Sequence, residues 1–250
     1  MPAALGVALV GLPLLGLLQR AAWSSLAHDL TSDASLDALR LSLATSIAAT
    51  GVALALGLPL AWVLARTDLP GRSVLRALVL LPMVLPPVVG GVALLSAFSL
   101  RSPLGGWLHD AFGIQLTFSP AGVVLAEAFV ALPFFVLTVE AALRQADDRY
   151  EQVAATLGAS PTATFRRVTI PTIAPALIAG AVLAWARALG EFGATITFAG
   201  NVAGRTRTLP LAVYLSLESD PDAAIALSLV LLAVSFVVLV GLRDRWMGRS

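Results

Sequence analysis

The sequence predicts an all-α integral membrane protein with six transmembrane helices. Of its 250 residues, 58% are hydrophobic and only 12% are charged, with a mean hydropathy of +0.89. Soluble domains carry about 25% charged residues. Several apolar runs are long enough to cross a bilayer core of about 30 Å. These runs are continuous rather than alternating, and lipid offers the backbone no hydrogen-bond partner, so they are helices rather than barrel strands.

We expect residues 1–250 to form a single transmembrane domain without a separate soluble core. The predicted spans are residues 3–18, 41–64, 74–98, 121–143, 174–199 and 223–242. The first run could instead be the apolar core of a secretory signal peptide. We favour a true span, because no basic residue precedes the run and no clear small-residue cleavage site follows Arg20.

The third predicted span carries helix breakers in its middle, namely Pro82, Pro86, Pro87, Gly90 and Gly91. One interpretation, which we favour, is a kink that fits the helix bundle. The other is a broken helix, as in many transporters, in which Pro86, Pro87 and Gly90 belong to a translocation path.

The arginines predict the orientation, because cytoplasmic loops of membrane proteins are enriched in basic residues. One side of the predicted membrane carries ten: Arg66, Arg72, Arg76, Arg144, Arg149, Arg166, Arg167, Arg243, Arg245 and Arg249. The other side carries five: Arg20, Arg40, Arg101, Arg205 and Arg207. We therefore expect both termini to be cytoplasmic, in a multi-pass protein of the bacterial inner membrane.

The longest predicted cytoplasmic connection, residues 145–171, has the pattern of two short helices. Tyr150, Val153, Ala154 and Leu157 recur at helical spacing, and Gly158 ends that helix.

A second short helix is expected to begin at Ser160-Pro161, with serine as its N-cap and proline in its first position. Thr164, Phe165 and Val168 lie along one side of that helix. Two short amphipathic helices with no core of their own indicate either a surface that docks on another protein or interfacial helices that lie on lipid headgroups. The spacing alone leaves both interpretations open.

The connection resembles the cytoplasmic signature loop of ABC-importer permeases. The family pattern is Glu-Ala-Ala, three residues, Gly, nine residues, then Ile-x-Leu-Pro. Gly158 occupies the glycine position, and Val168, Ile170 and Pro171 follow at the family's spacing. The resemblance implies that this loop is a coupling helix seated in a groove of a separate ATPase subunit.

At the Glu-Ala-Ala triplet the chain has Gln152-Val153-Ala154, with Glu151 immediately before it. This departure affects one possible contact with the ATPase and leaves the spacing intact. The residues that the resemblance assigns to ATPase coupling are Glu151, Gln152, Ala154, Gly158, Ala159, Phe165 and Pro171.

Two further segments are similar to one group within these permeases. Residues 185–215 and residues 80–91 resemble the molybdate, tungstate and sulfate permeases, and molybdate permeases most. With the loop, the resemblance covers about residues 37–240. It implies the type I transmembrane fold of ABC importers, import of a tetrahedral oxyanion, an ATPase subunit, an extracytoplasmic binding protein and a second permease copy as partners.

Arg187 and Glu191 lie four residues apart inside the fifth predicted span, where helical spacing places them on one face. Pairing removes much of the cost of a charge in the bilayer, which insertion scales put at about 2.5–3.5 kcal/mol. The pair could simply hold the bundle together or face a water-filled cavity. Alternatively, Arg187 lines an anion path and Glu191 is its counter-ion.

Other functions receive less support from the sequence. The chain has no cysteine, no lysine and no phosphate-binding loop of the Walker type, so we expect a transport subunit that is not itself an enzyme and has no cofactor, metal site or nucleic-acid partner. An intramembrane hydrolase would depend on Glu127, Glu140 or Glu191, which form no recognisable pattern. An ion-driven carrier would explain charges within the membrane, but it gives no reason for the 145–171 loop.

Overall fold

Five helices of the computed structural model, which describes residues 1–241, are long and apolar enough to cross a membrane. They are α1 (Pro2–Gln19), α3 (Asp33–Arg66), α7 (Pro120–Gln145), the helical run Pro161–Leu189 that ends as α10 (Ile170–Leu189), and α13 (Pro221–Gly241). A bent pair of helices makes a sixth crossing if it is counted as one span. Residues 1–241 contain no strand, which confirms the all-α prediction.

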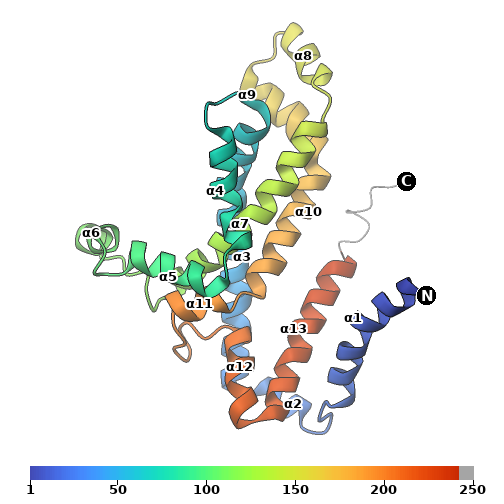
Figure 1. Ribbon diagram of the computed structural model, residues 1–250, viewed down its shortest axis with the longest axis vertical. Coiled ribbons are helices and arrows are strands. Elements are labelled where there is room, and N and C mark those ends of the chain that lie inside the picture. The colour runs from blue at the N-terminus through green and yellow to red at the C-terminus, as the bar shows by residue number, and fades with distance from the viewer. Residues whose placement is uncertain (242–250) are drawn as a thin grey trace.

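The bundle is built on α7, which packs between α3 and α10 (Figure 1). Phe135 of α7 is buried where the three helices meet. A methyl group added at Gly57 of α3 would lie 2.7 Å from its ring, and one added at Gly180 of α10 would lie 3.1 Å from it. Small residues allow this close approach, which is how helices associate in lipid, where no hydrophobic force drives them together.

The second predicted span is longer than expected, because α3 begins at Asp33 rather than near residue 41. Ser32 caps the helix by accepting a hydrogen bond from the Ser35 N–H (3.3 Å). The 34 residues of α3 reach about 50 Å, well beyond a bilayer core of about 30 Å. The first turns of α3, which include Arg40, are therefore helical, although they are too polar to have been predicted as part of a transmembrane span.

The third predicted span is two helices, so the favoured interpretation of a kink is wrong. α4 (Arg72–Val84) and α5 (Pro87–Phe98) meet at a bend of 118°. Leu85 and Pro86 both have extended backbones (ψ 136° and 133°), as expected for residues that precede a proline. Two consecutive extended residues redirect the chain, and α5 and α6 (Pro103–Phe112) run sideways from the bundle (Figure 1).

The fifth predicted span is also displaced. Its helix starts at Pro161, as α9 (Pro161–Thr164) and a π-helical turn (Phe165–Thr169) that continue into α10. It stops at Leu189, and a separate helix α11 (Gly193–Phe198) follows. The π-helical turn explains why Pro171 does not break the continuous helical run Pro161–Leu189, which we call the rod. The Ile170 N–H donates to the Phe165 carbonyl five residues back, which relaxes the ladder where proline has no N–H.

The remaining helices lie at the two ends of the bundle. α8 (Arg149–Thr156) caps one end, while α2 (Leu26–Thr31) and α12 (Leu209–Ser219) lie at the other (Figure 1). α1 stands beside α13 and has no buried residue. The predicted sixth span corresponds to α13, and its last residue, Leu242, lies outside the described residues together with the C-terminal arginines.

Packing of α5 against α11 gives a test of the fold. A methyl group at Gly91 would lie 2.9 Å from the Ala194 carbonyl oxygen and 2.6 Å from Thr197 Cβ, so Gly91→Ala forces the helices apart. We expect a loss of about 1–3 kcal/mol of stability, as for other overpacked sites. Gly51→Ala in α3 meets nothing within 4 Å and should be neutral or slightly stabilising. Thermal melting in detergent compares the two, and equal melting temperatures would contradict this packing.

Candidate functional site

The first candidate site is the α8 end of the bundle. α8 ends in a Schellman motif, in which Gly158 has a positive φ of 84° and the Ala159 N–H donates to the Ala154 carbonyl (3.0 Å). Ser160 caps the next helix by accepting from the Ala163 N–H (3.3 Å), with Pro161 in the first position. These features confirm the predicted glycine stop and N-cap. The second helix is not short, however, because it continues as α10.

Glu151 faces the protein rather than the exterior. Its Oε1 accepts a hydrogen bond from Thr169 Oγ1 (2.8 Å) and lies 3.5 Å from Arg66 Nη2, at the end of α3. Arg66 also forms an ion pair with Asp148. The following Gln152, which stands where the family has glutamate, is exposed. The acidic neighbour therefore does not substitute for the family's glutamate on the exposed side of α8, because it joins α8 to α3 and to the π-helical turn.

Three large apolar side chains on and just after α8 are exposed, alongside polar residues such as Gln152. Tyr150 is 64% exposed, Val153 is 56% and Leu157 is 82%, whereas Ala154 and Ala159 are half-buried. Large apolar side chains gathered on a projecting helix are typical of a surface that another molecule covers.

Two of the predicted coupling residues lie away from the exposed side of α8. Phe165 packs edge-on against Trp62, with ring centroids 5.0 Å apart, and so anchors the rod to α3. Pro171 is exposed on the first turn of α10. Among the predicted coupling residues, Gln152 is therefore exposed on α8, whereas Glu151 and Phe165 attach the loop to the bundle.

The second candidate site lies where two helix breaks meet. A methyl group added at Gly193, the first residue of α11, would lie 2.8 Å from Pro87 Cβ and 3.3 Å from the Val88 nitrogen, so the start of α11 lies against the start of α5. Gly90 is buried nearby in α5, against the ring of Phe129. The structure thus brings the proline-rich break and the end of α10 together.

Each break satisfies part of its own backbone. Pro86 and Pro87 have no N–H, and the N–H groups of Val89 and Gly90 both donate to the Pro86 carbonyl (2.9 and 3.2 Å). At the other break, the Ala194 N–H donates to Glu191 Oε1 (2.7 Å). A non-helical backbone at membrane depth needs such partners.

Arg187 and Glu191 form the predicted ion pair, with Arg187 Nη2 2.6 Å from Glu191 Oε2. The expectation that both lie on one continuous helix is wrong, because α10 ends at Leu189 and Glu191 lies in the break. The Glu191 side chain is 1% exposed and uses both oxygens, one on Arg187 and one on Ala194. Arg187 stays 27% exposed, so part of its guanidinium can still meet an anion.

The sequence did not lead us to predict a buried polar cluster between α3 and α7. Glu127 of α7 accepts a hydrogen bond from Thr45 Oγ1 of α3 (3.0 Å), and Ser42 Oγ accepts one from the Leu209 N–H (2.6 Å). Ser42, Thr45 and Ser46 are buried on one face of α3. Their i, i+3, i+4 spacing was the available signal. Glu127, Glu140 and Glu191, the acids considered for an intramembrane hydrolase, each accept hydrogen bonds from different partners.

The broken spans and the projecting α8 are those of a polytopic membrane protein. A family model for the inner membrane component of binding-protein-dependent transport systems matches residues 38–249. The chain belongs to this family of ABC-transporter permeases, and it is a multi-pass inner-membrane protein.

Among individual proteins, the chain is 50% identical over 247 residues to the molybdenum transport system permease protein ModB of Mycobacterium tuberculosis, covering 98% of this chain and 92% of that protein. It is 38% identical over 232 residues to the sulfate transport system permease protein CysT of Escherichia coli, covering 91% and 83%. A bacterial ABC transporter involved in alginate import has the same fold, with a TM-score of 0.76 at 16% identity over 99% of this chain and 93% of that one. The type I transmembrane fold is thereby confirmed.

The inward contacts of Glu151 predict different effects for two adjacent residues. Glu151→Ala removes the partner of Thr169 and Arg66, a loss of about 1.5 kcal/mol for a hydrogen bond to a charged group. Amide hydrogen exchange in residues 149–170 should then be roughly tenfold faster. Gln152→Ala is the matched control, and its exchange should equal that of the unmodified protein. Equal exchange in both variants would show that Glu151 does not hold α8.

Proposed function

We propose that this chain is the membrane-spanning subunit of an ATP-driven importer, which carries a tetrahedral oxyanion, molybdate, into the cytoplasm. The group of large apolar side chains exposed at α8 is the observation that carries the proposal. A membrane protein that displays Tyr150, Val153 and Leu157 beyond its bundle needs a partner there. Within this family of permeases, that partner is an ABC ATPase subunit seated on the 145–171 loop.

The energy comes from this ATPase, since the chain's sequence contains no phosphate-binding loop. The arginines support the orientation, because α8, the π-helical turn and the ends of α3, α4 and α7 carry seven of them at one end of the bundle. That end is cytoplasmic in our proposal, together with both termini. The α12 end then faces an extracytoplasmic binding protein, as the related alginate transporter is described in complex with a periplasmic protein that carries its ligand.

Transport proceeds by alternating access in a dimer of this chain, because a single bundle of this size provides little room for a path on its own. Movement of α8 in the ATPase groove passes to α3 through Arg66 and to the rod 161–189 through Thr169. The rod ends beside Arg187, which lines the path. Glu191 offsets most of its charge, so the anion is attracted weakly enough to leave again.

Molybdate is favoured by the 50% identity to molybdenum permeases. Sulfate is the second candidate, because a sulfate permease is 38% identical over most of the chain. Tungstate has the same shape and charge as molybdate. Uptake of radiolabelled molybdate into vesicles, in competition with sulfate and with tungstate, ranks the three ions.

Coupling is tested at Gly158. Gly158→Arg should leave the protein inserted and the ATPase active but reduce uptake at least about tenfold, because a docking hot spot contributes about 2 kcal/mol or more. Gly113→Arg is the matched control, since Gly113 also ends a helix with positive φ (66°), has open space around it and lies in the chain after α6. Both arginines carry a similar backbone strain of about 1–2 kcal/mol. Normal uptake by Gly158→Arg would count against docking at α8.

The path is tested with the double variant Arg187→Gln/Glu191→Gln, in which both side chains are neutral. The side-chain carbonyl at position 191 can still accept a hydrogen bond from the Ala194 N–H, and no charge is left buried, so the fold should survive. Molybdate uptake should fall roughly 10- to 100-fold, the value of a charge-assisted hydrogen bond of about 1.5–3 kcal/mol. Vesicle uptake and thermal melting are measured together. A stable double variant with normal uptake would show that the pair only holds the bundle.

A further inference from the structure

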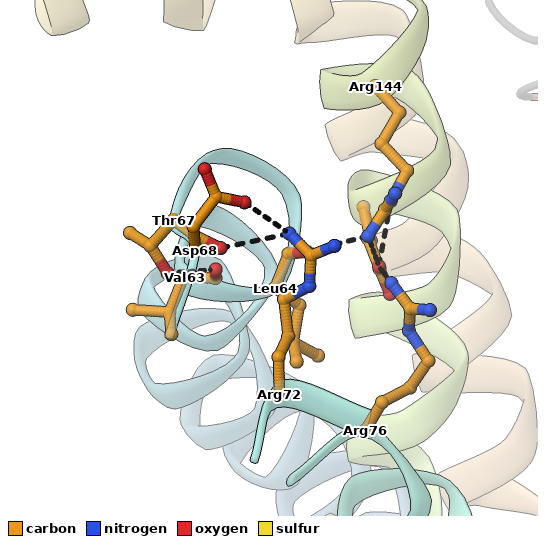
Figure 2. A network of polar contacts seen from close by, with 8 residues as sticks. Val63, Leu64, Thr67, Asp68, Arg72, Arg76 and Arg144 are labelled. Atoms are coloured by element: carbon orange, nitrogen blue, oxygen red, sulfur yellow. Dashed lines mark hydrogen bonds and ion pairs between the residues drawn. The ribbon is translucent and has the colours of Figure 1, made fainter. Parts of the chain in front are cut away.

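A second cationic group lies at the α8 end of the bundle, far from Arg187 in the chain. Arg76 of α4 and Arg144 of α7 both bind Oε1 of Glu140, the latter through Nε at 2.9 Å (Figure 2). Arg144 also donates to the Leu64 carbonyl of α3 (2.7 Å), so the group joins three helices. The buried Glu140 holds the two guanidinium groups beside one another.

The charges of this group do not cancel. Two guanidinium groups share one carboxylate, which leaves a net charge of +1 on Arg76, Glu140 and Arg144. The Glu140 side chain is 5% exposed, but those of Arg76 and Arg144 are 37% and 39% exposed. Within residues 1–241, Glu140 is the only hydrogen-bond acceptor of Arg76, whose guanidinium carries five N–H donors. The unused donors can bind an anion that approaches from outside.

A cavity of about 330 Å³ opens at this group. It is lined by Arg76, Leu137, Glu140, Ala141 and Arg144. Arg144 is in the last turn of α7, while Leu137 lies nearly two turns further into the span and is 44% exposed. The cavity therefore has cationic groups near the end of the helices and an apolar wall towards the membrane interior.

We infer that Arg76 and Arg144 form a binding site for a tetrahedral oxyanion at the inner face of the membrane, supplied as the phosphate of an anionic phospholipid. Guanidinium groups match the oxygens of such an anion through paired hydrogen bonds. Basic pockets between transmembrane helices on the cytoplasmic side bind phospholipid headgroups, and the wall at Leu137 suits an acyl chain. The other source of the same chemistry is a free oxyanion in the cytoplasm.

The site is separate from the proposed path and depends on the proposed function only for calling this side cytoplasmic. A phosphate there would fix α4 against α7 and, through Leu64, the end of α3. Arg66, which holds α8, follows Leu64 by two residues. Lipid bound at the site would therefore steady the part of the bundle to which α8 is attached.

The test is retention of lipid by the full-length protein in nanodiscs of phosphatidylcholine with phosphatidylglycerol, measured by native mass spectrometry. Arg76→Gln leaves Glu140 paired with Arg144, and it should bind phosphatidylglycerol about fivefold more weakly, the value of one basic residue at a membrane surface. Arg72→Gln is the matched control. It removes an arginine one turn away on the same helix that does not line the cavity, and should retain lipid normally.

A second arm distinguishes the source, with sulfate binding measured in nanodiscs of phosphatidylcholine alone. Arg76-dependent lipid retention supports a lipid site, whereas Arg76-dependent sulfate binding alone supports the same oxyanion site filled from the cytoplasm. Equal binding by the unmodified protein and Arg76→Gln in both arms would overturn the proposal. If Arg76→Gln fails to melt cooperatively, Arg76→Lys keeps the charge but loses the paired geometry, and unchanged binding of both ligands by that variant and by Arg144→Lys would overturn it as well.

Discussion

The absence of hydrogen-bond partners in lipid is the constraint on which this structure depends. A helix can stop at membrane depth only if its last carbonyls and the first N–H groups of the next helix find partners within the protein. This chain ends two helices within predicted spans, α4 at Val84 and α10 at Leu189. Prolines remove two of the donors at the first break, and Glu191 accepts from the helix that follows the second. The breaks also lie against one another, at Pro87 and Gly193.

The same constraint explains why one rod can serve both candidate sites. The run Pro161–Leu189 begins beside Gly158, keeps its backbone bonded through the π-helical turn, and ends two residues before Glu191. Its 29 residues span about 43 Å, more than the bilayer core. A rigid element of that length moves both its ends when one end is pushed. The run contacts Glu151 of α8 through its Thr169, and it carries Arg187, which pairs with Glu191, near its other end. It therefore connects the exposed α8 to the interior charge pair without an intermediate chain of side chains.

Continuous apolar runs predicted which segments form helices long and apolar enough to cross a membrane, as in α1, α3, α7 and α13. They could not predict where α3 begins, since the polar residues after Asp33 are helical beyond the membrane. They could not separate a kink from a break at Pro86 either, because the outcome depends on contacts that α11 supplies from more than 100 residues away. At the α8 end, local signals at Gly158 and Ser160 sufficed for the caps. The inward turn of Glu151 depends on Arg66, which is distant in the chain, and only the fold brings the two together.

Charge in this protein is arranged in partly neutralised groups, and that arrangement suits a transporter better than a storage site. A fully exposed arginine would bind an oxyanion weakly in water, while a buried, unpaired one would cost several kcal/mol and would hold the anion too firmly. Arg187 lies between these limits, because Glu191 occupies one side of its guanidinium and leaves the rest accessible. Arg76 and Arg144 share Glu140 in the same way, but with an excess of positive charge. The Arg187–Glu191 pair has one carboxylate for one guanidinium, whereas Arg76 and Arg144 share a single carboxylate. This difference is the one expected if Arg187 releases its anion on each transport cycle and Arg76 and Arg144 retain theirs.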